Sequence, residues 1–257
     1  MDKKNGFHSS DFQKDFYDRL GRTKADDGGM LSCSFEERYN PKMIVDDKRA
    51  FDMFADLFSP LFTEESNNVI LDMCSGTGMH LPVLNQFPGI IIGADLSFGL
   101  LEVARGLKRE LSLDSTLLVQ SLAEKIPLKD NSCDAIIMID AIHHVEDQAG
   151  VMKELSRVAK PNAPFLLIEP NVTNPLVYLA HRIPVEERGA LRSNTLRGLT
   201  ELVHPYIDSV TIQPFNYVAS RKSNPIEKAA FKVIEWGFKT LFFFWPIRIL
   251  LQGRFKK

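Results

Sequence analysis

Five short, nearly uninterrupted apolar runs constrain the fold of this chain more than any other feature of its sequence. They lie at residues 69–71, 90–92, 116–119, 135–139 and 164–168. Runs of this length that are apolar on both faces are typical of buried parallel strands. Segments with apolar side chains at helical spacing, at residues 96–110 and 146–158, separate several of them. Alternating strands and helices predict an α/β fold with a doubly wound sheet and helices on both faces.

The segments outside these five runs predict the rest of the sheet and its cover. Residues 210–218 and 247–255 have the pattern of two further strands, which brings the expected sheet to seven mostly parallel strands. Helical spacing recurs at residues 46–62, 196–204 and 226–244.

Composition narrows the class of protein. Hydrophobic residues make up 44% of the 257 residues, which is enough to bury a sizeable core. The formal net charge of −2 gives no global basic field, so we expect no nucleic-acid partner. Cys33, Cys74 and Cys133 show neither metal-ligand spacing nor a paired framework. We therefore expect no metal site, no secretory signal and no membrane span, and a cytoplasmic location.

The loop at residues 72–78 (DMCSGTG) directly follows the first apolar run. In doubly wound sheets, ligands bind beyond the carboxyl ends of the strands. Gly76 and Gly78 permit positive φ and a close approach of a ligand, and the following helix offers free N–H groups. A dinucleotide fingerprint requires a third glycine where Leu81 stands. Asp72 would repel a pyrophosphate, whereas it suits a ligand that carries positive charge, such as S-adenosylmethionine.

A second carboxylate, Asp95, ends the next apolar run. A carboxylate at the tip of the neighbouring strand can accept hydrogen bonds from both hydroxyls of a ribose, each worth about 1.5–3 kcal/mol. Acidic residues at this spacing serve ribose in both dinucleotide and S-adenosylmethionine folds, so Asp95 alone does not choose between them. The competing interpretation is a helix-capping carboxylate, because Ser97 stands at the expected helix start.

The ordered series of motifs from residue 66 to residue 171 resembles the class I S-adenosylmethionine-dependent methyltransferases, particularly the small-molecule type 11 group with its ubiquinone/menaquinone-type enzymes. VILDMCSGTGMHLPVL is similar to the first motif of that family, and IIGADLSFGLLEVAR is similar to the second. SLAEKIPLKDNSCDAIIMIDAIHHVED resembles the third and fourth motifs together. KELSRVAKPNAPFLLIEPN resembles the region of the fifth strand.

This resemblance implies S-adenosylmethionine as the cofactor and a set of residues that bind it. The set is Asp72, Cys74, Ser75, Gly76, Thr77, Gly78, Asp95, Leu96, Leu122, Ala123, Asp140 and Tyr39, the last as a lid aromatic. Cys74 replaces the first glycine of the family, which is tolerable if its φ stays negative. Leu122 replaces the usual acidic residue that meets the adenine amine, which leaves packing and the Ala123 backbone for adenine.

The resemblance also implies a domain organisation. We expect an N-terminal helical cap over residues 1–62, which covers the cofactor. The methyltransferase domain would span residues 63–257, with lid insertions near 170–206 and 224–245 over the acceptor.

Methyl transfer requires alignment of the reacting atoms and exclusion of water, and it needs a base only if the nucleophile must lose a proton. Asp140 and His143 follow the fourth strand, where the acceptor would meet the methyl group, and His143 is able to act as a base near neutral pH. The competing interpretation of His143 is a packed or capping residue. The implied function is methyl transfer to an O, N or C atom of a small or lipid-like molecule. The alternatives are a non-catalytic S-adenosylmethionine-binding partner protein and a nicotinamide-dependent oxidoreductase.

The aromatic stretch at residues 241–247 (LFFFWPI) has two interpretations. We expect a core or lid helix over the acceptor. The alternative is a peripheral contact with the inner face of a membrane through residues 239–257, helped by cationic side chains. These are Lys239, Arg248, Arg254, Lys256 and Lys257. The sequence indicates neither the acceptor nor the oligomeric state.

Overall fold

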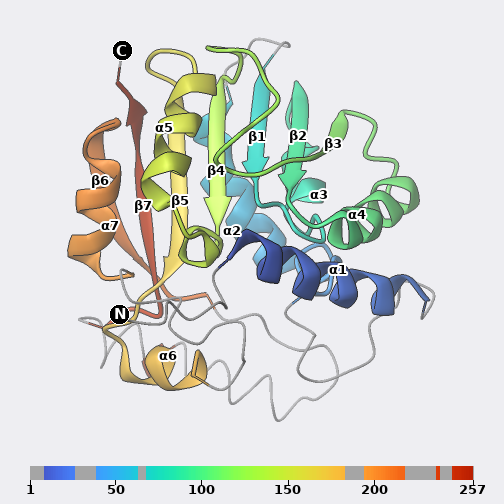
Figure 1. Cartoon of the computed structure of the whole chain (residues 1–257), viewed down its shortest axis with the longest axis horizontal. Coiled ribbons are helices and arrows are strands. Elements are labelled where there is room, and N and C mark those ends of the chain that lie inside the picture. Colours follow the sequence, from blue (N-terminus) through green and yellow to red (C-terminus); the bar gives the residue numbers. More distant parts are fainter. Residues whose placement is uncertain are drawn as a thin grey trace.

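The computed structural model describes residues 9–26, 39–62, 68–182, 194–217, 236–237 and 245–256. Its centre is a seven-stranded sheet in the order β3-β2-β1-β4-β5-β7-β6 (Figure 1). The strands are β1 (Val69–Met73), β2 (Ile90–Asp95), β3 (Thr116–Gln120), β4 (Ala135–Ile139), β5 (Pro164–Pro170), β6 (Ile207–Phe215) and β7 (Arg248–Phe255). The five apolar runs are therefore β1 to β5, and the predicted doubly wound sheet is confirmed.

Strand direction divides the sheet into two parts. β1 pairs in parallel with β2 and β4, β2 pairs with β3, and β4 pairs with β5. β7 runs antiparallel between β5 and β6. The strand expected at residues 210–218 instead covers Ile207–Phe215, because Ile207 is the residue of this edge strand that is buried in the core. A register shift between Asp208 and Thr211 interrupts its pairing.

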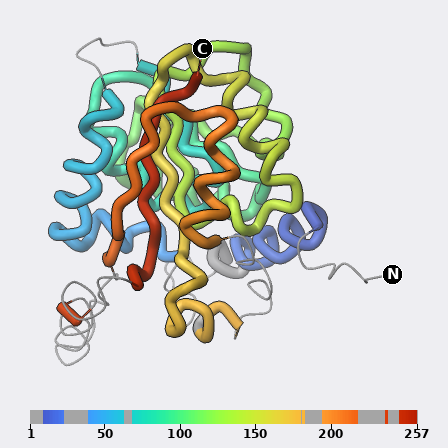
Figure 2. Tube along the Cα trace, turned by 90° about the vertical axis from the view of Figure 1, so that its left-hand side faces the viewer, coloured from blue at the N-terminus to red at the C-terminus, as the bar shows by residue number. Residues whose placement is uncertain are grey.

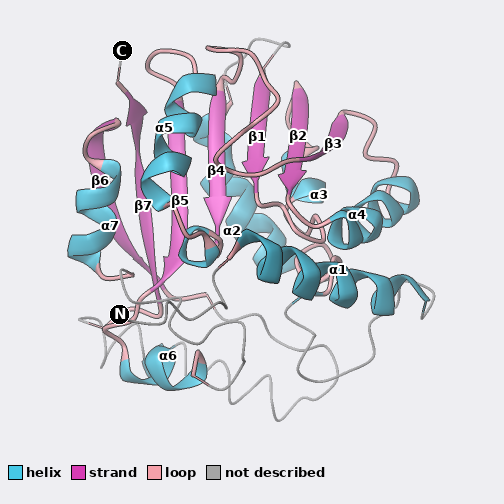
Figure 3. Ribbon diagram, viewed as in Figure 1, coloured by secondary structure: helices cyan, strands magenta, loops and turns pink. Residues whose placement is uncertain are grey.

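Helices and 3₁₀ turns precede β1 and connect several of the later strands, as the colours of Figure 3 show. They are α1 (Ser10–Asp26), α2 (Lys48–Phe58), η3 (Ser59–Leu61), α3 (Leu81–Leu84), α4 (Phe98–Glu110), η4 (Ile142–His144), α5 (Gln148–Val158), α6 (Pro175–Ala180) and α7 (Leu196–Val203). The predicted cap of α4 is confirmed, because the Ser97 hydroxyl accepts a hydrogen bond from the Leu100 N–H. Asp147 caps α5 in the same way through the Gly150 N–H.

Helices lie on both faces of the sheet (Figure 2), and an apolar layer lies between the sheet and the helices on each face. α5 and α7 cover one face and α2 covers the other, where Phe54 and Phe58 pack with Ile70, Ile137 and Leu166. Strand residues alternate between the two layers, because successive side chains of a strand point to opposite faces. α2 is thus part of the layer that covers the sheet, whereas α1 packs against α4 beside the carboxyl ends of β1 and β2.

The strand expected at residues 247–255 is confirmed as Arg248–Phe255, and its burial bears on the alternative of a membrane contact. Residues 248–255 form an internal strand with Ile249, Leu250 and Leu251 buried, so this part of the 239–257 segment is not available to a membrane. Ile249 and Leu251 belong to one apolar layer and Leu250 to the other, so both faces of this strand are covered. Most of the helix expected at residues 226–244, and residues 183–193 of the expected insertion, lie outside the described residues. Within the described part of the chain, no helix has the length and hydropathy to span a bilayer.

Candidate cofactor and catalytic site

The loop after β1 turns sharply through three residues in left-handed conformation. Cys74, Gly76 and Gly78 have φ angles of 61°, 55° and 78°. A Cβ atom at Gly78 would lie 2.7 Å from Cδ1 of Leu81, so this glycine is needed both for its φ and for its lack of a side chain. The condition set for Cys74 in place of glycine, a negative φ, is not met. The turn requires a left-handed residue there, which costs a non-glycine residue about 1–2 kcal/mol.

Buried polar atoms along the same loop test whether the residues fit the expected cofactor. Within the described residues, Asp72 Oδ2, Ser75 Oγ and Thr77 Oγ1 are buried and have no hydrogen-bond partner. Each such atom costs about 1–3 kcal/mol unless a ligand satisfies it. Asp72 is only 2% exposed, and burial, with a smaller contribution from Asp95, raises its pKa to about 8. A cationic ligand would stabilise the Asp72 carboxylate, so the donor set fits the ammonium end of S-adenosylmethionine.

Asp95 joins the loop to the end of β2. Its Oδ2 accepts a hydrogen bond from the Gly76 N–H at 2.8 Å, and its Oδ1 accepts one from the Ser97 N–H at 2.8 Å. Burial raises the pKa of Asp95 to about 6, although these backbone hydrogen bonds oppose the rise. A carboxylate has about four lone-pair sites, so Asp95 keeps acceptor capacity for a hydroxyl of a ribose. Asp95 is therefore both a structural support of the loop and a group able to bind ribose.

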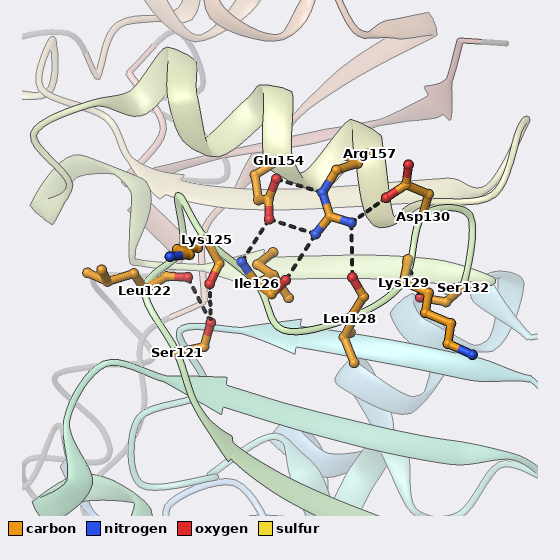
Figure 4. Close-up of polar contacts among 10 residues, drawn as sticks. All are labelled: Ser121, Leu122, Lys125, Ile126, Leu128, Lys129, Asp130, Ser132, Glu154 and Arg157. Carbon is orange, nitrogen blue, oxygen red and sulfur yellow. Dashed lines mark hydrogen bonds and ion pairs between the residues drawn. The ribbon is translucent and has the colours of Figure 1, made fainter.

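The connection between β3 and β4 carries Leu122 and Ala123, and an arginine holds it against α5 (Figure 4). Arg157 donates hydrogen bonds to the carbonyls of Ile126 and Leu128, both at 2.9 Å. Its partner Glu154 accepts one from the Ile126 N–H. Leu122 is 38% exposed and Ala123 is buried, so an apolar surface stands where the family has an acidic residue.

The hydroxyl of Ser121 fixes the start of the same connection. Its single O–H is shared between the carbonyl oxygens of Leu122 and Lys125, at 2.8 and 3.2 Å (Figure 4). Leu96, at the end of β2, accepts a hydrogen bond at its carbonyl from Gln120 Nε2 at 3.0 Å. The carbonyls of Leu96 and Leu122 thus accept hydrogen bonds from the side chains of Gln120 and Ser121, at the ends of neighbouring strands.

Asp140, the first residue after β4, forms an ion pair that the sequence analysis did not foresee. Arg248 Nε lies 2.9 and 3.1 Å from its two carboxylate oxygens. Burial alone would raise the pKa of Asp140, but the ion pair and hydrogen bonds with Arg248 hold it below its usual value. Arg248 is the first residue of β7, far from Asp140 in the chain, and no local sequence pattern connects the two. An aspartate held in this way is a poor proton acceptor.

His143 lies in η4, directly beyond β4, and a second missed residue holds it. Its Nδ1 is 2.5 Å from Oε2 of Glu169, and both side chains are buried. Glu169 lies near the end of β5 and directly follows the fifth apolar run. The sequence therefore carried a usable signal, since an acidic residue after an apolar run also marked Asp95.

The N-terminal segment reaches the same edge of the sheet. The hydroxyl of Tyr39 lies 3.5 Å from that of Tyr17 in α1, which lies 3.4 Å from Nε2 of His144. The carboxylate of Asp18, also in α1, accepts hydrogen bonds from the Ser97 hydroxyl and the Gly99 N–H. The structure thus brings the predicted lid residue Tyr39 beside the region of His143, with Tyr17 between them.

Comparison with known proteins agrees with this geometry. Residues 71–167 match the family model described as "Methyltransferase domain". Demethylmenaquinone methyltransferase of Oceanobacillus iheyensis is 32% identical over 108 residues, which are 41% of this chain and 45% of that protein. Malonyl-[acyl-carrier protein] O-methyltransferase of a Marinomonas species is 40% identical over 96 residues, which are 37% of this chain and 35% of that protein. The chain spans about half or less of the length of these two curated relatives.

Solved structures support the fold. The YcgJ protein of Bacillus subtilis superposes with a TM-score of 0.57 at 19% identity, over 82% of this chain and 100% of that one. Phosphoethanolamine N-methyltransferase 2 of Haemonchus contortus was solved in complex with S-adenosylmethionine. It superposes with a TM-score of 0.64 at 16% identity, over 94% of this chain and 60% of that one. Residues 71–167 thus match a methyltransferase domain, and the strand order and the solved structures show that the chain shares the fold of S-adenosylmethionine-dependent methyltransferases.

Proposed function

We propose that this chain transfers a methyl group from S-adenosylmethionine to an O, N or C atom of a small or lipid-like molecule. The observation that carries the proposal is Asp72. A buried carboxylate whose pKa is about 8, with one oxygen that has no partner among the described residues, is unfavourable until a cation reaches it. A ligand with an ammonium group offers that cation.

Different residues of the chain would bind different parts of S-adenosylmethionine. Asp72 would hold the ammonium, Asp95 the ribose hydroxyls, and Leu122 with Ala123 the adenine. When bound, S-adenosylmethionine supplies an electrophilic methyl group on a sulfonium. The edge formed by the ends of β1, β4 and β5 would then orient the acceptor and exclude water, which is the main catalytic requirement of such a displacement.

The names of the relatives support a lipid-like acceptor, because they include demethylmenaquinone, ubiquinone/menaquinone and malonyl-[acyl-carrier protein] methyltransferases. A cytoplasmic location and a peripheral contact with the inner membrane face, near the half-exposed Trp245, belong to this proposal. Co-sedimentation with anionic vesicles tests the contact, and a protein that stays in the supernatant at low salt would argue against it.

Calorimetric titration tests the cofactor. We expect S-adenosylhomocysteine to bind the wild type and NADH not to bind, because Leu81 is buried where a dinucleotide loop requires glycine. Asp95→Asn should weaken S-adenosylhomocysteine at least tenfold, which corresponds to about 1.4 kcal/mol. The matched control is Asp56→Asn on the exposed face of α2. Tight NADH binding would overturn the proposal, whereas cofactor binding without transfer to any lipid or metabolite extract would favour a non-catalytic partner protein.

A further inference from the structure

Glu169 receives more hydrogen bonds than its structural position requires. Its Oε1 accepts bonds from the Ala141 and Ile142 N–H groups at 2.7 and 2.9 Å. Its Oε2 accepts a bond from Asn194 Nδ2 at 2.8 Å and lies 2.5 Å from His143 Nδ1. A deprotonated carboxylate only accepts hydrogen bonds, so it matches four donors. The side chain is 0% exposed, and a buried charge is tolerated only when it is satisfied in this way.

The two oxygens of Glu169 serve different purposes. Oε1 fixes the backbone turn between β4 and η4, and one acceptor oxygen is sufficient for that role. Oε2 pairs with His143 instead. If the pair served only to stabilise the fold, a well-packed apolar contact would avoid the desolvation free energy of the buried carboxylate. The pairing with Oε2 therefore points to a role for the imidazole.

The geometry determines the tautomer of His143. Because Nδ1–H donates to Glu169, Nε2 of the neutral ring carries the lone pair and is able to take a proton. The carboxylate also stabilises the imidazolium that forms when Nε2 is protonated, as the aspartate does in a Ser-His-Asp triad. The ring is held by packing against His144, with centroids 4.1 Å apart.

Other charged groups around this pair leave its role intact. Arg248 acts electrostatically on Glu169, but its guanidinium is already paired with Asp140. Among the described residues, Asp140 acts electrostatically on His143, and Cys74 on Glu169. The rings of His144 in η4 and His181 after α6 contact that of His143, and His80 before α3 interacts with Asp140. Burial lowers the pKa of His80 to about 4, so His80 is neutral near pH 7 and adds no competing charge.

We propose that Glu169 is a positioning residue that prepares His143 as the general base, and that the acceptor is therefore a hydroxyl compound. This inference rests on the proposed methyl transfer. The proton of the hydroxyl passes to Nε2 of His143, while the oxygen forms its new bond to the methyl carbon. The electrons of the broken methyl–sulfur bond remain on sulfur, and the imidazolium later releases its proton to water.

A second buried atom near this pair supports a polar acceptor. Asn194 is fully buried and is held through its Nδ2 by Glu169, while its Oδ1 has no hydrogen-bond partner within the described residues. A hydroxyl compound offers the donor that this oxygen lacks.

The test is Glu169→Gln, which keeps the shape and one acceptor oxygen for the turn but presents an N–H₂ to His143. Nitrogen-15 NMR of the imidazoles should show His143 protonated at Nδ1 in the wild type and at Nε2 in the variant. This measurement needs no acceptor. A wild-type ring protonated at Nε2, or an unchanged ring in the variant, would overturn the inference.

Turnover with a long-chain alkyl hydroquinone as the probe acceptor gives the second readout. We expect Glu169→Gln and His143→Gln each to lower kcat at least 100-fold, and the double variant to lose no more, because the two residues act as a unit. S-adenosylhomocysteine affinity should change less than about twofold, and the control Glu201→Gln on the surface of α7 should match the wild type. Turnover that persists in His143→Gln would overturn the inference. This outcome is decisive even if the Glu169→Gln variant does not fold.

The two proposals fail in distinguishable ways. A wild type that does not bind S-adenosylhomocysteine contradicts the proposed function itself. A wild type that binds it and methylates only acceptors without a hydroxyl, such as a fatty carboxylate, contradicts this inference alone.

Discussion

Gly21 of α1 and Gly99 of α4 meet backbone to backbone. A Cβ atom at Gly21 would lie 2.1 Å from the carbonyl carbon of Gly99, and one at Gly99 would lie 2.5 Å from the carbonyl oxygen of Asp18. The Asp18 carboxylate also accepts a hydrogen bond from the Gly99 N–H at 3.0 Å. α1 is therefore fixed to the start of α4, beside the β2 end that carries Asp95.

Gly21→Ala should displace α1. The added methyl group has no room, and overpacking of this kind costs about 1–3 kcal/mol. The matched control is Gly106→Ala in α4, where a Cβ would meet nothing within 4 Å. That change should stabilise the protein by about 0.5–1 kcal/mol, because alanine is the better helix residue. Urea unfolding measures both, and shifts of the same sign would contradict the close contact.

Cofactor binding should release protons near neutral pH. With a pKa of about 8, Asp72 is largely protonated at about pH 7 in the free protein, and an ammonium beside it would favour the carboxylate. Titration with S-adenosylhomocysteine in phosphate and in Tris should therefore give different apparent enthalpies. Asp72→Asn should bind more weakly and with equal enthalpies in the two buffers. Equal enthalpies in the wild type would mean that Asp72 is already ionised.

The stability of the free protein should fall as the pH rises. The folded-state pKa of Asp72 is raised from 3.8 to about 8, so its stabilising effect is fully present below about pH 4 and is lost as the pH approaches 8. The raised pKa of Asp95 also lowers the stability of the free protein as the pH rises towards about 6. Asp72→Asn should therefore raise Tm relative to the wild type, and more so at about pH 8 than at about pH 5. A Tm difference between variant and wild type that is the same at both pH values would contradict the raised pKa of Asp72.

Cys74 should be replaceable by glycine more easily than by alanine. Both substitutions remove the thiol, but only glycine adopts a φ of 61° without strain. Relief of the strain is partly offset by the greater freedom of glycine in the unfolded chain. We therefore expect Cys74→Gly to exceed Cys74→Ala by about 0.5–1 kcal/mol in the free energy of unfolding. The reverse order would mean that the loop changes conformation to avoid the strain.

Arg157→Met should loosen the connection between β3 and β4. The change removes the hydrogen bonds to Ile126 and Leu128 and the ion pairs with Glu154 and Asp130. We expect a loss of about 1–3 kcal/mol and faster amide exchange in residues 121–134. Arg197→Met removes only an exposed pair on α7 and should cost below about 1 kcal/mol. Equal losses of stability in Arg157→Met and Arg197→Met would show that Arg157 does not hold the connection between β3 and β4.

The sequence predicted the parts of the fold that depend on local pattern. β1 to β5, α4, α5 and the Ser97 cap follow from short-range periodicity and capping, and the structure confirms them. The glycine loop was also predicted, but the φ of Cys74 was not. Residue type favours a negative angle, and the tight turn between β1 and α3 overrides that preference.

The parts that were missed depend on pairs far apart in the chain. Arg248 meets Asp140, and Asp18 meets Ser97, only after the sheet has formed. Neither pair leaves a periodic trace in the sequence. Glu169 differs, because its position after an apolar run matched that of Asp95 and was detectable. The roles assigned to the binding residues and the helix at residues 226–244 remain predictions.

The place of β7 between β5 and β6 has a consequence for synthesis. β6 emerges from the ribosome before β7, the strand that must separate it from β5. Until then, β5 presents an unpaired backbone edge flanked by apolar side chains, which is the kind of surface that templates aggregation. The nascent chain therefore passes through a stage with an open sheet, and its yield in the cell should depend on how long that edge stays exposed.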